Sequence, residues 1–442
     1  MNRSPDPVLV VGAGIAGIQA ALDLAEAGVP AVLVEREAFV GGNMARLDKT
    51  FPTLDCSSCT LTPRTSDVAR HPNIRLLTRA DLVGLEERGR GFRARLRVRP
   101  RFVDPGACTA CGRCAEACRL RGRVPGRFDL GLSRRSAIDL PFPQAVPAAY
   151  AVDPARCLFL TRGRCGRDGP RCVAACETGA VRLDEKPREE TLDVSAVVVA
   201  TGYHPYRPDD PETGRPELGY GTYPEVITNL QFERLASASG PTGGELRVAR
   251  DEPRRVVFVQ CVGSRDRTTG AAYCSRVCCM ASVKHALLVL EKIPGAEPVV
   301  LYMDLRCFGR GYEEFLERAG RAGVVFRRGN PSEVYRRGAR LAVRFEDTLL
   351  GRTEELEADL VVLAAGLRPA EGLGDLARTI GLEIGPDGFL EPADPLDPAR
   401  SPRAGVFLAG ACLGPMDIPD AVASGSAAAS AALAHVLGEA GP

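Results

Sequence analysis

Hydrophobic positions along this chain fall into short continuous apolar runs that alternate with helical spacings, a pattern typical of parallel α/β folds. The segment 8–35 is predicted to be strand, helix and strand, and 254–304 repeats that order. An alanine-rich helix is predicted over 419–437. Further buried strands are predicted at the apolar runs 74–78, 194–202, 360–366 and 405–411. Two α/β units therefore account for most of the periodic sequence.

Two stretches interrupt this periodic pattern. At 102–187, cysteine, proline, glycine and arginine replace the periodic segments, which indicates an inserted module. Residues 204–250 are rich in Pro, Gly and Ser and are predicted to form a long excursion from the α/β units.

Composition excludes several classes of function. The 442 residues are 45% hydrophobic and carry a net charge of +1, so charge gives no reason to expect binding to nucleic acid or to an anionic membrane. No apolar run is long enough for a membrane span, and the N-terminus has no signal-peptide core. We therefore expect a cytoplasmic protein, in which clustered cysteines indicate metal rather than disulfides.

The loop after the first predicted strand carries a dinucleotide-binding fingerprint. Gly12 makes the tight turn, Gly14 lets the backbone approach a pyrophosphate, and Gly17 permits close packing of helix on strand. Glu35 ends the second strand, where an acid accepts hydrogen bonds from ribose hydroxyls. The fingerprint alone does not distinguish FAD from NAD.

Two further segments favour FAD. Ala200-Thr201-Gly202 and the tail 405–412 resemble segments of the two-dinucleotide-domain flavoproteins, in which the C-terminal helix points its N-terminus at the flavin. This chain departs from that family at Gly410-Ala411, where an acid usually follows the glycine. Asp417 and Asp420 are the candidate substitutes.

Twelve of the 16 cysteines form three groups of four. The first group has the bacterial ferredoxin spacing C-x2-C-x2-C-x3-C, which argues against paired zinc knuckles. In two-cluster ferredoxins the fourth cysteine of each group serves the other cluster. That crossing rule predicts one cluster on Cys108, Cys111, Cys114 and Cys176, and another on Cys157, Cys165, Cys172 and Cys118. The alternative for the second group is a relic fold whose cysteines no longer bind metal.

The third group lies where a second nucleotide loop would be expected. The loop after 254–260 lacks the glycine fingerprint, so NAD(P)H binding is not favoured there. It carries instead Cys261, Cys274, Cys278 and Cys279. Their spacing alone leaves two hypotheses equal, a third cluster or four buried core cysteines.

Long irregular segments of the chain resemble the A subunit of heterodisulfide reductase. These segments are residues 41–65, the first cysteine group with ferredoxin spacing (108–118), and residues 142–153, 261–286 and 409–429. The resemblance covers nearly the whole chain and implies an α/β fold of the thioredoxin-reductase-like, two-dinucleotide-binding-domain class with an inserted two-cluster ferredoxin module. It also implies a non-standard cluster on the third cysteine group and a lysine, Lys284, beside the flavin as the candidate catalytic residue. The chain is similar in size to the A subunit of the quinone-interacting membrane-bound oxidoreductase.

The resemblance suggests cofactors, contacts and domain limits. We expect FAD and three [4Fe–4S] clusters. The predicted FAD contacts are Gly12, Gly14, Gly17, Glu35, Arg36, Gly42, Asn43, Ala200, Thr201, Gly202, Gly410, Asp417 and Ile418. The predicted domains are an FAD-binding first part (1–101), the ferredoxin-like module (102–187), the FAD-domain return and linker (188–252), a second Rossmann-like domain with the non-standard cluster (253–366) and the C-terminal FAD-binding part (367–442).

The implied function is electron transfer between flavin and clusters in a heterodisulfide-reductase-like complex, with bifurcation as a further hypothesis. The expected partners are B and C subunits or equivalents, with ferredoxin, hydrogenase or formate dehydrogenase modules as other candidates, and a homodimer within the complex. The alternatives are the A-type subunit of a quinone-interacting complex, a stand-alone NAD(P)H-dependent flavin oxidoreductase, and a scaffold with structural clusters.

The remaining four cysteines are predicted to pack in the interior. Cys56 and Cys59 have the thioredoxin-like C-x2-C spacing of a redox dithiol, but we favour packing for this pair. Cys307 and Cys412 are also predicted to pack.

Overall fold

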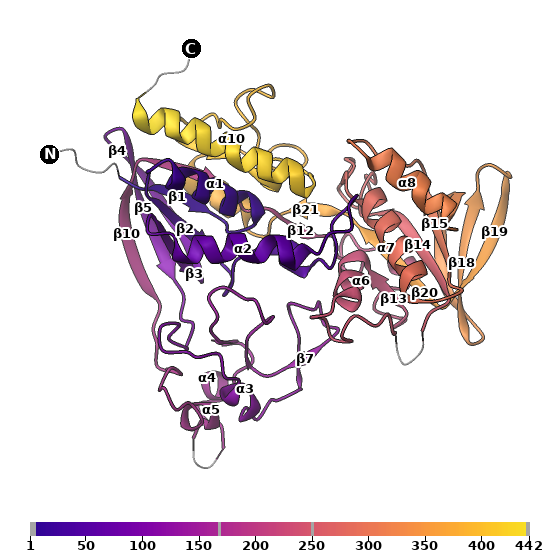
Figure 1. The fold of residues 1–442 in the computed structure, drawn as a ribbon, viewed down its shortest axis with the longest axis horizontal. Coiled ribbons are helices and arrows are strands. Elements are labelled where there is room, and N and C mark those ends of the chain that lie inside the picture. The colour runs from indigo at the N-terminus through magenta and orange to yellow at the C-terminus, as the bar shows by residue number, and fades with distance from the viewer. Residues whose placement is uncertain (1–5, 167–168, 249–251, 439–442) are drawn as a thin grey trace.

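The computed structural model describes residues 6–166, 169–248 and 252–438 (Figure 1). Its first layer is a five-stranded parallel sheet, of which four strands are buried along their whole length and one edge strand is only partly buried. In spatial order the strands are β22 (Val406–Leu408), β11 (Ala196–Val199), β1 (Val8–Val11), β2 (Ala31–Glu35) and β3 (Ile74–Thr78).

Helices cover one face of this sheet and a second sheet covers the other. The helices are α1 (Ile15–Glu26), α2 (Ser57–Arg70) and the long C-terminal α10 (Ile418–Leu437), which packs along α1 (Figure 1). The other face packs on α9 (Leu373–Ile380) and an antiparallel sheet of β10 (Arg188–Val194), β5 (Gly91–Val98) and β4 (Ala80–Arg88).

A second five-stranded parallel sheet repeats this plan. Its strands in spatial order are β13 (Val226–Thr228), β20 (Leu360–Ala365), β14 (Arg255–Val262), β15 (Glu297–Tyr302) and β16 (Val325–Arg328). One face packs on α6 (Asn229–Ala236), α7 (Cys278–Lys292) and α8 (Tyr312–Arg321). The other packs on the antiparallel strands β17 (Pro331–Arg337), β18 (Arg340–Asp347) and β19 (Arg352–Ala358).

The chain crosses between the two sheets through a short antiparallel pair, β12 (Tyr203–Pro205) with β21 (Leu367–Pro369). The described residues also form the 3₁₀ turns η1 (Gly42–Arg46), η2 (Pro216–Leu218) and η3 (Gly410–Cys412). No helix in the described ranges is both long and apolar enough to cross a bilayer.

The cysteine-rich module projects from the first sheet as a separate lobe, at the bottom of Figure 1. It leaves after β5 and returns into β10, and these two strands pair with each other, so the insertion does not disturb the sheet. Its elements are the two-residue strands β6 (Val124–Pro125), β7 (Arg134–Arg135), β8 (Ile138–Asp139) and β9 (Ala151–Val152) and the short helices α3 (Arg113–Glu116), α4 (Leu158–Arg162) and α5 (Arg171–Ala174). Cysteines form part of its small core, together with Phe102, Ile138, Leu183 and several valines.

The structure contains elements that the hydrophobic pattern did not predict. The segment 204–250, predicted to be an excursion, supplies β13 and α6 to the second sheet. A capping box between Thr228 and Gln231 begins α6, so local hydrogen bonds rather than an apolar stripe define its start. Helices α2, α8 and α9 were also not predicted.

Candidate functional site: a dinucleotide cradle and three cysteine sets

The three glycines after β1 have different surroundings. Gly12 has a φ of 105°, and a Cβ there would lie 2.3 Å from the carbonyl oxygen of Ala200. A Cβ on Gly17 would lie 1.9 Å from the carbonyl oxygen of Gly12. A Cβ on Gly14, at the N-cap of α1, would meet no atom within 4 Å. This open space beside a helix N-terminus fits a pyrophosphate group.

The end of β2 supports the same loop. The two carboxylate oxygens of Glu35 accept hydrogen bonds from the backbone N–H groups of Ala13 and Glu37, each at 2.8 Å. Burial raises the pKa of Glu35, although these two hydrogen bonds act in the opposite direction. Each oxygen keeps a lone pair that can accept from a ribose hydroxyl. Arg36, by contrast, donates to the carbonyl oxygen of Glu371 at 2.5 Å.

Other predicted FAD contacts surround this loop. Gly42 approaches it closely, because a Cβ there would lie 3.1 Å from Cα of Gly14. The Asn43 amide donates to the carbonyl oxygen of Tyr203 at 2.9 Å, which joins the segment after β2 to the segment after β11. The Thr201 hydroxyl, between Ala200 and Gly202, is buried with no hydrogen-bond partner within the described ranges. An unpartnered hydroxyl at this position fits a polar ligand.

The C-terminal helix starts at Ile418 with its cap already engaged. Asp417 accepts from the backbone N–H of Asp420 at 3.0 Å and from the Tyr312 hydroxyl at 2.6 Å. This carboxylate therefore links α10 to α8 of the second sheet. Gly410, in η3, donates its N–H to the Ser424 hydroxyl on the same helix at 3.0 Å.

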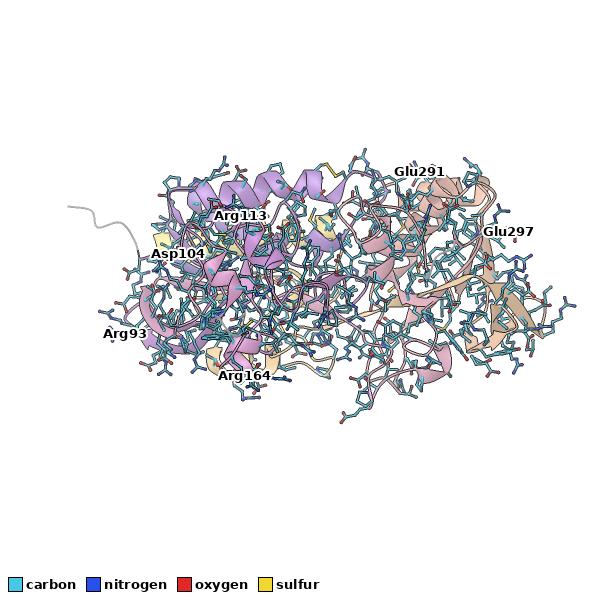
Figure 2. All side chains as sticks on the ribbon, turned by 90° about the horizontal axis from the view of Figure 1, so that it is seen from below. Arg93, Asp104, Arg113, Arg164, Glu291 and Glu297 are labelled. Atoms are coloured by element: carbon cyan, nitrogen blue, oxygen red, sulfur yellow. A yellow bond between two sulfur atoms is a disulfide. The ribbon has the colours of Figure 1, made fainter. Side chains whose placement is uncertain are left out.

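The eight cysteines of the module lie around two cavities. The larger is about 110 Å³, and its cysteines are Cys108, Cys111, Cys114 and Cys176. The smaller is about 20 Å³, and its cysteines are Cys118, Cys157, Cys165 and Cys172. These are the two sets that the crossing rule groups, and cluster binding by them stays a prediction. Asp104, Arg113 and Arg164, which are labelled in Figure 2, belong to this module by their position in the sequence.

The larger cavity combines a buried and an exposed sulfur. Burial raises the pKa of Cys114 to about 12, so this thiol is protonated until a metal replaces the proton. Cys111 is exposed, and hydrogen bonds from the Arg113 backbone and the Thr109 side chain lower its pKa. Such donors also stabilise a metal-bound thiolate.

The third cysteine set gathers between β14 and α7. Cys278 and Cys279 open α7, and burial raises the pKa of Cys278 well above that of an ordinary thiol, with Cys261, Cys279 and Cys274 raising it further. Backbone N–H groups donate to two of the sulfurs, that of Arg276 to Cys274 at 3.3 Å and that of Arg306 to Cys279 at 3.4 Å. The closeness of the four cysteines and the N–H groups directed at two of their sulfurs are both features expected of cluster ligands.

Within the described ranges, no three His, Cys, Asp or Glu side chains are close enough together to hold a single metal ion. The predicted clusters do not require such a group, because each of the four irons in a cubane takes its own thiolate.

The loop after β14 is filled by protein rather than open to a nucleotide. Cys261, near the end of β14, has a φ of 59°, and Gly263, the first residue after the strand, has a φ of 70°. A Cβ on Gly263 would lie 2.2 Å from the ring of Tyr206. The backbone of this loop therefore faces an aromatic ring where a dinucleotide loop would face a pyrophosphate.

Lys284 is 2% exposed on α7 and belongs to a buried charged cluster. Its ammonium group pairs with Glu233 of α6 and donates to the carbonyl oxygen of Lys49 at 2.7 Å. Nε2 of His285 lies 2.5 Å from the same Glu233 oxygen. Burial alone would raise the pKa of Glu233, but the Lys284 and His285 charges lower it to about 2. The other carboxylate oxygen accepts from the backbone N–H of Asp48 at 3.0 Å.

Sequence reasoning missed Glu233, because it lies in the segment predicted to be an excursion. The acid joins the loop after η1 to α7, and so links the first sheet's side of the molecule to the second. Lys284 itself is buried rather than exposed on the surface of α7.

The prediction that Cys56 and Cys59 simply pack is wrong, because the structure joins their sulfurs in a disulfide at the start of α2. The C-x2-C spacing at a helix N-terminus was the available signal. Cys412 does pack, with its buried sulfur donating to the carbonyl oxygens of Val199 and Ala409.

Comparison with known proteins shows which families match this sequence and which solved structures share its fold. Residues 7–52 match the FAD dependent oxidoreductase family, and residues 168–425 match the pyridine nucleotide-disulphide oxidoreductase family. The fold is similar to thioredoxin reductase of T. acidophilum, with a TM-score of 0.53 at 13% identity over 98% of this chain and all of that one. Thioredoxin reductase of Lactococcus lactis gives the same TM-score at 14% identity over 98% of this chain and 99% of that one.

The chain is thus a flavoprotein oxidoreductase of the pyridine nucleotide-disulphide oxidoreductase class, and the predicted fold class is confirmed. Within that class it belongs to the family of heterodisulfide reductase A subunits. It is 46% identical over 98% of its length to the A subunit of H(2):CoB-CoM heterodisulfide,ferredoxin reductase from Methanothermobacter marburgensis. It is 47% identical over 96% of its length to the iron-sulfur A subunit of CoB--CoM heterodisulfide reductase from Methanocaldococcus jannaschii. The chain spans 64% and 63% of these two relatives.

Proposed function

We propose that this protein is an FAD- and iron–sulfur-containing electron-transfer subunit of a heterodisulfide-reductase-like complex. The observation that carries the proposal is the gathering of twelve cysteines into three sets of four around a flavoprotein fold. When bound, FAD would exchange electrons in pairs or singly, and [4Fe–4S] clusters would exchange them singly.

Different residues of the chain would bind FAD and adjust the reduction potential of a cluster. The loop at Gly14 and the N-terminus of α1 would bind the pyrophosphate, and Glu35 would orient the ribose. The N–H groups directed at the Cys274 and Cys279 sulfurs would raise the potential of a cluster there, because they stabilise added negative charge.

Lys284 would act on the flavin through its charge. Its ammonium group is held by Glu233 and the Lys49 carbonyl, so its position is fixed in a dry site. A fixed cation would stabilise negative charge on reduced FAD. Glu233 would be a positioning residue, because it acts through Lys284.

The names of the relatives support a proposal about partners. The name of the Methanococcus maripaludis relative, the A subunit of H(2)/formate:CoB-CoM heterodisulfide,ferredoxin reductase, includes hydrogen, formate and ferredoxin. We propose B- and C-type subunits as partners of this chain, with hydrogenase, formate dehydrogenase or ferredoxin modules supplying or accepting electrons. Flavin-based bifurcation is a further hypothesis, tested by measuring both one-electron potentials of bound FAD.

An anaerobic reductive titration of the purified protein tests the proposal. We expect reversible bleaching of cluster absorbance and of the flavin band on the same titration curve, with reoxidation restoring both. Flavin reduction without any cluster bleaching would contradict electron transfer between them. Rapid reduction by NADH or NADPH alone would instead support a stand-alone flavin oxidoreductase.

A further inference from the structure

The Cys56–Cys59 disulfide differs from the other sulfurs of this protein. In the part of the chain that the structure describes, the 14 other cysteines are free thiols. The two bonded residues are three apart in sequence. Because loop-closure entropy grows with loop length, so short a ring stabilises the fold less than a long-range disulfide would. Structural cross-linking is therefore a poor explanation for the pair.

The two sulfurs have unequal surroundings. Cys56 is the N-cap of the 14-residue helix α2 and is half-buried, and its sulfur lies 3.2 Å from the backbone N–H of Cys59 and 3.4 Å from the Ser58 hydroxyl. Both groups can donate to a thiolate on Cys56, and the helix N-terminus stabilises its negative charge. Cys59 is exposed and open to attack.

We propose that Cys56 and Cys59 form a thiol–disulfide exchange site whose co-substrate is a dithiol, either a small molecule or a protein of the C-x2-C type. The attacking thiolate bonds to Cys59, the sulfur–sulfur bond to Cys56 breaks, and Cys56 leaves as the stabilised thiolate. The second thiol of the co-substrate then attacks its own bonded sulfur and releases Cys59. The dithiol is oxidised to a disulfide, and the pair takes up two electrons and two protons to become two thiols.

The site adjoins the charged cluster around Lys284. Lys49 and Cys56 form a backbone bridge, and the Lys49 carbonyl accepts the Lys284 hydrogen bond at 2.7 Å. Reduction of the disulfide would therefore remove a covalent tie next to a segment that holds Lys284. The inference does not rest on the proposed function, because neither cysteine belongs to a cluster set.

The test follows one peptide in the full-length protein, purified anaerobically with its cofactors. Trypsin cuts after Lys49 and Arg64, and the peptide 50–64 contains Cys56 and Cys59 but no other cysteine. The protein is incubated with glutathione and glutathione disulfide at the cytosolic ratio or with dithiothreitol, alkylated, and analysed by mass spectrometry. We expect reduction by both reagents, with trapped glutathione on Cys59 at least about tenfold more often than on Cys56. A peptide that stays oxidised, or glutathione mainly on Cys56, would overturn the proposal.

Two matched variants test the role of the leaving thiolate. Ser58→Ala removes the hydroxyl donor to Cys56, and we expect reduction to slow about threefold, as a leaving group of higher pKa requires. Thr60→Ala removes a hydroxyl in the same turn that contacts the Cys56 carbonyl oxygen rather than the sulfur, and should react like the parent. Equal rates for the two variants would contradict the mechanism.

A double variant, Cys56→Ser with Cys59→Ser, separates this site from the clusters. It should keep the iron content of the parent protein. Loss of iron would identify the pair as metal ligands and overturn the exchange site, whereas the electron-transfer function would be unaffected by that result.

Discussion

The two parallel sheets of this protein place a loop and a helix at the same position, after the central strand of each. In the first sheet, β1 leads through a loop of three residues into α1, and Gly14 leaves open space at the helix N-terminus. In the second, β14 leads through a loop of 15 residues into α7, and Cys261, Cys274, Cys278 and Cys279 gather there.

The difference shows how one strand–loop–helix unit can serve two kinds of ligand. A pyrophosphate is bound by backbone N–H groups, so its loop must be short and free of side chains. A cluster is bound by thiolates, so its loop must be long enough to present side chains from several directions. The helices differ too, since α1 buries apolar residues and glycine whereas α7 also buries Lys284 and His285.

The largest effect is expected from removing a thiolate of the third set. Cys278→Ala should remove one cluster, about four irons per chain, while FAD stays bound to the first sheet. Cys307→Ala is the matched control, because its half-buried thiol lies near Cys279 but is outside the set. Iron and flavin analysis of both variants measures the effect. An unchanged iron content in Cys278→Ala would show that the third cysteine set, beside the second sheet, binds no cluster.

The buried charges on α7 should affect stability next most strongly. Glu233→Gln leaves the buried Lys284 ammonium without its carboxylate and should lower the free energy of unfolding by about 3–5 kcal/mol. Glu317→Gln, which breaks the exposed pair with Arg321, should cost less than about 0.5 kcal/mol. Urea unfolding monitored by circular dichroism compares the two, and equal costs would mean that the cluster around Lys284 does not stabilise α7.

The open space at Gly14 can be filled without touching the rest of the loop. Gly14→Ala should fold normally but bind FAD at least about tenfold more weakly, a loss comparable to one charge-assisted hydrogen bond. Gly320→Ala, also in open space but on α8, should leave FAD binding unchanged and alter stability by at most about 1 kcal/mol. Flavin titration of the apoprotein measures the affinities. An unchanged affinity of Gly14→Ala for FAD would mean that the pyrophosphate does not bind beside Gly14.

The smallest effect is expected from the lysine charge. Lys284→Ala should lower the flavin midpoint potential by some tens of millivolts, because about 30 mV corresponds to 1.4 kcal/mol for two electrons. Lys292→Ala, at the exposed end of the same helix, should leave the potential unchanged. Redox titration measures the flavin midpoint potential of both variants. Identical potentials in the two variants would mean that Lys284 does not lie close to the flavin.

Patterns with strong physical constraints could be predicted from the sequence. The strand predicted at 74–78 is β3, and the glycine loop between two apolar runs forms as expected. The crossing rule of two-cluster ferredoxins predicted which cysteines of the module share each cavity, although Cys176 is far in sequence from Cys108, Cys111 and Cys114.

Elements defined by tertiary contacts could not be predicted in this way. Helix α2 is rich in Ser and Thr and contains Pro63, so its sequence shows no clear apolar stripe. Glu233 acquires its role from Lys284, which is 51 residues away in sequence. The C-x2-C spacing of Cys56 and Cys59 fits both packing and redox chemistry, and only the structure shows that the two sulfurs are bonded.

The most direct test of the account is the iron, sulfide and flavin content per chain after anaerobic purification. Three cubanes on twelve cysteines predict about twelve irons, about twelve sulfides and one FAD. About eight irons would leave one cysteine set without its cluster and contradict the three-cluster assignment. A flavin-containing protein with no iron would contradict electron transfer through clusters altogether.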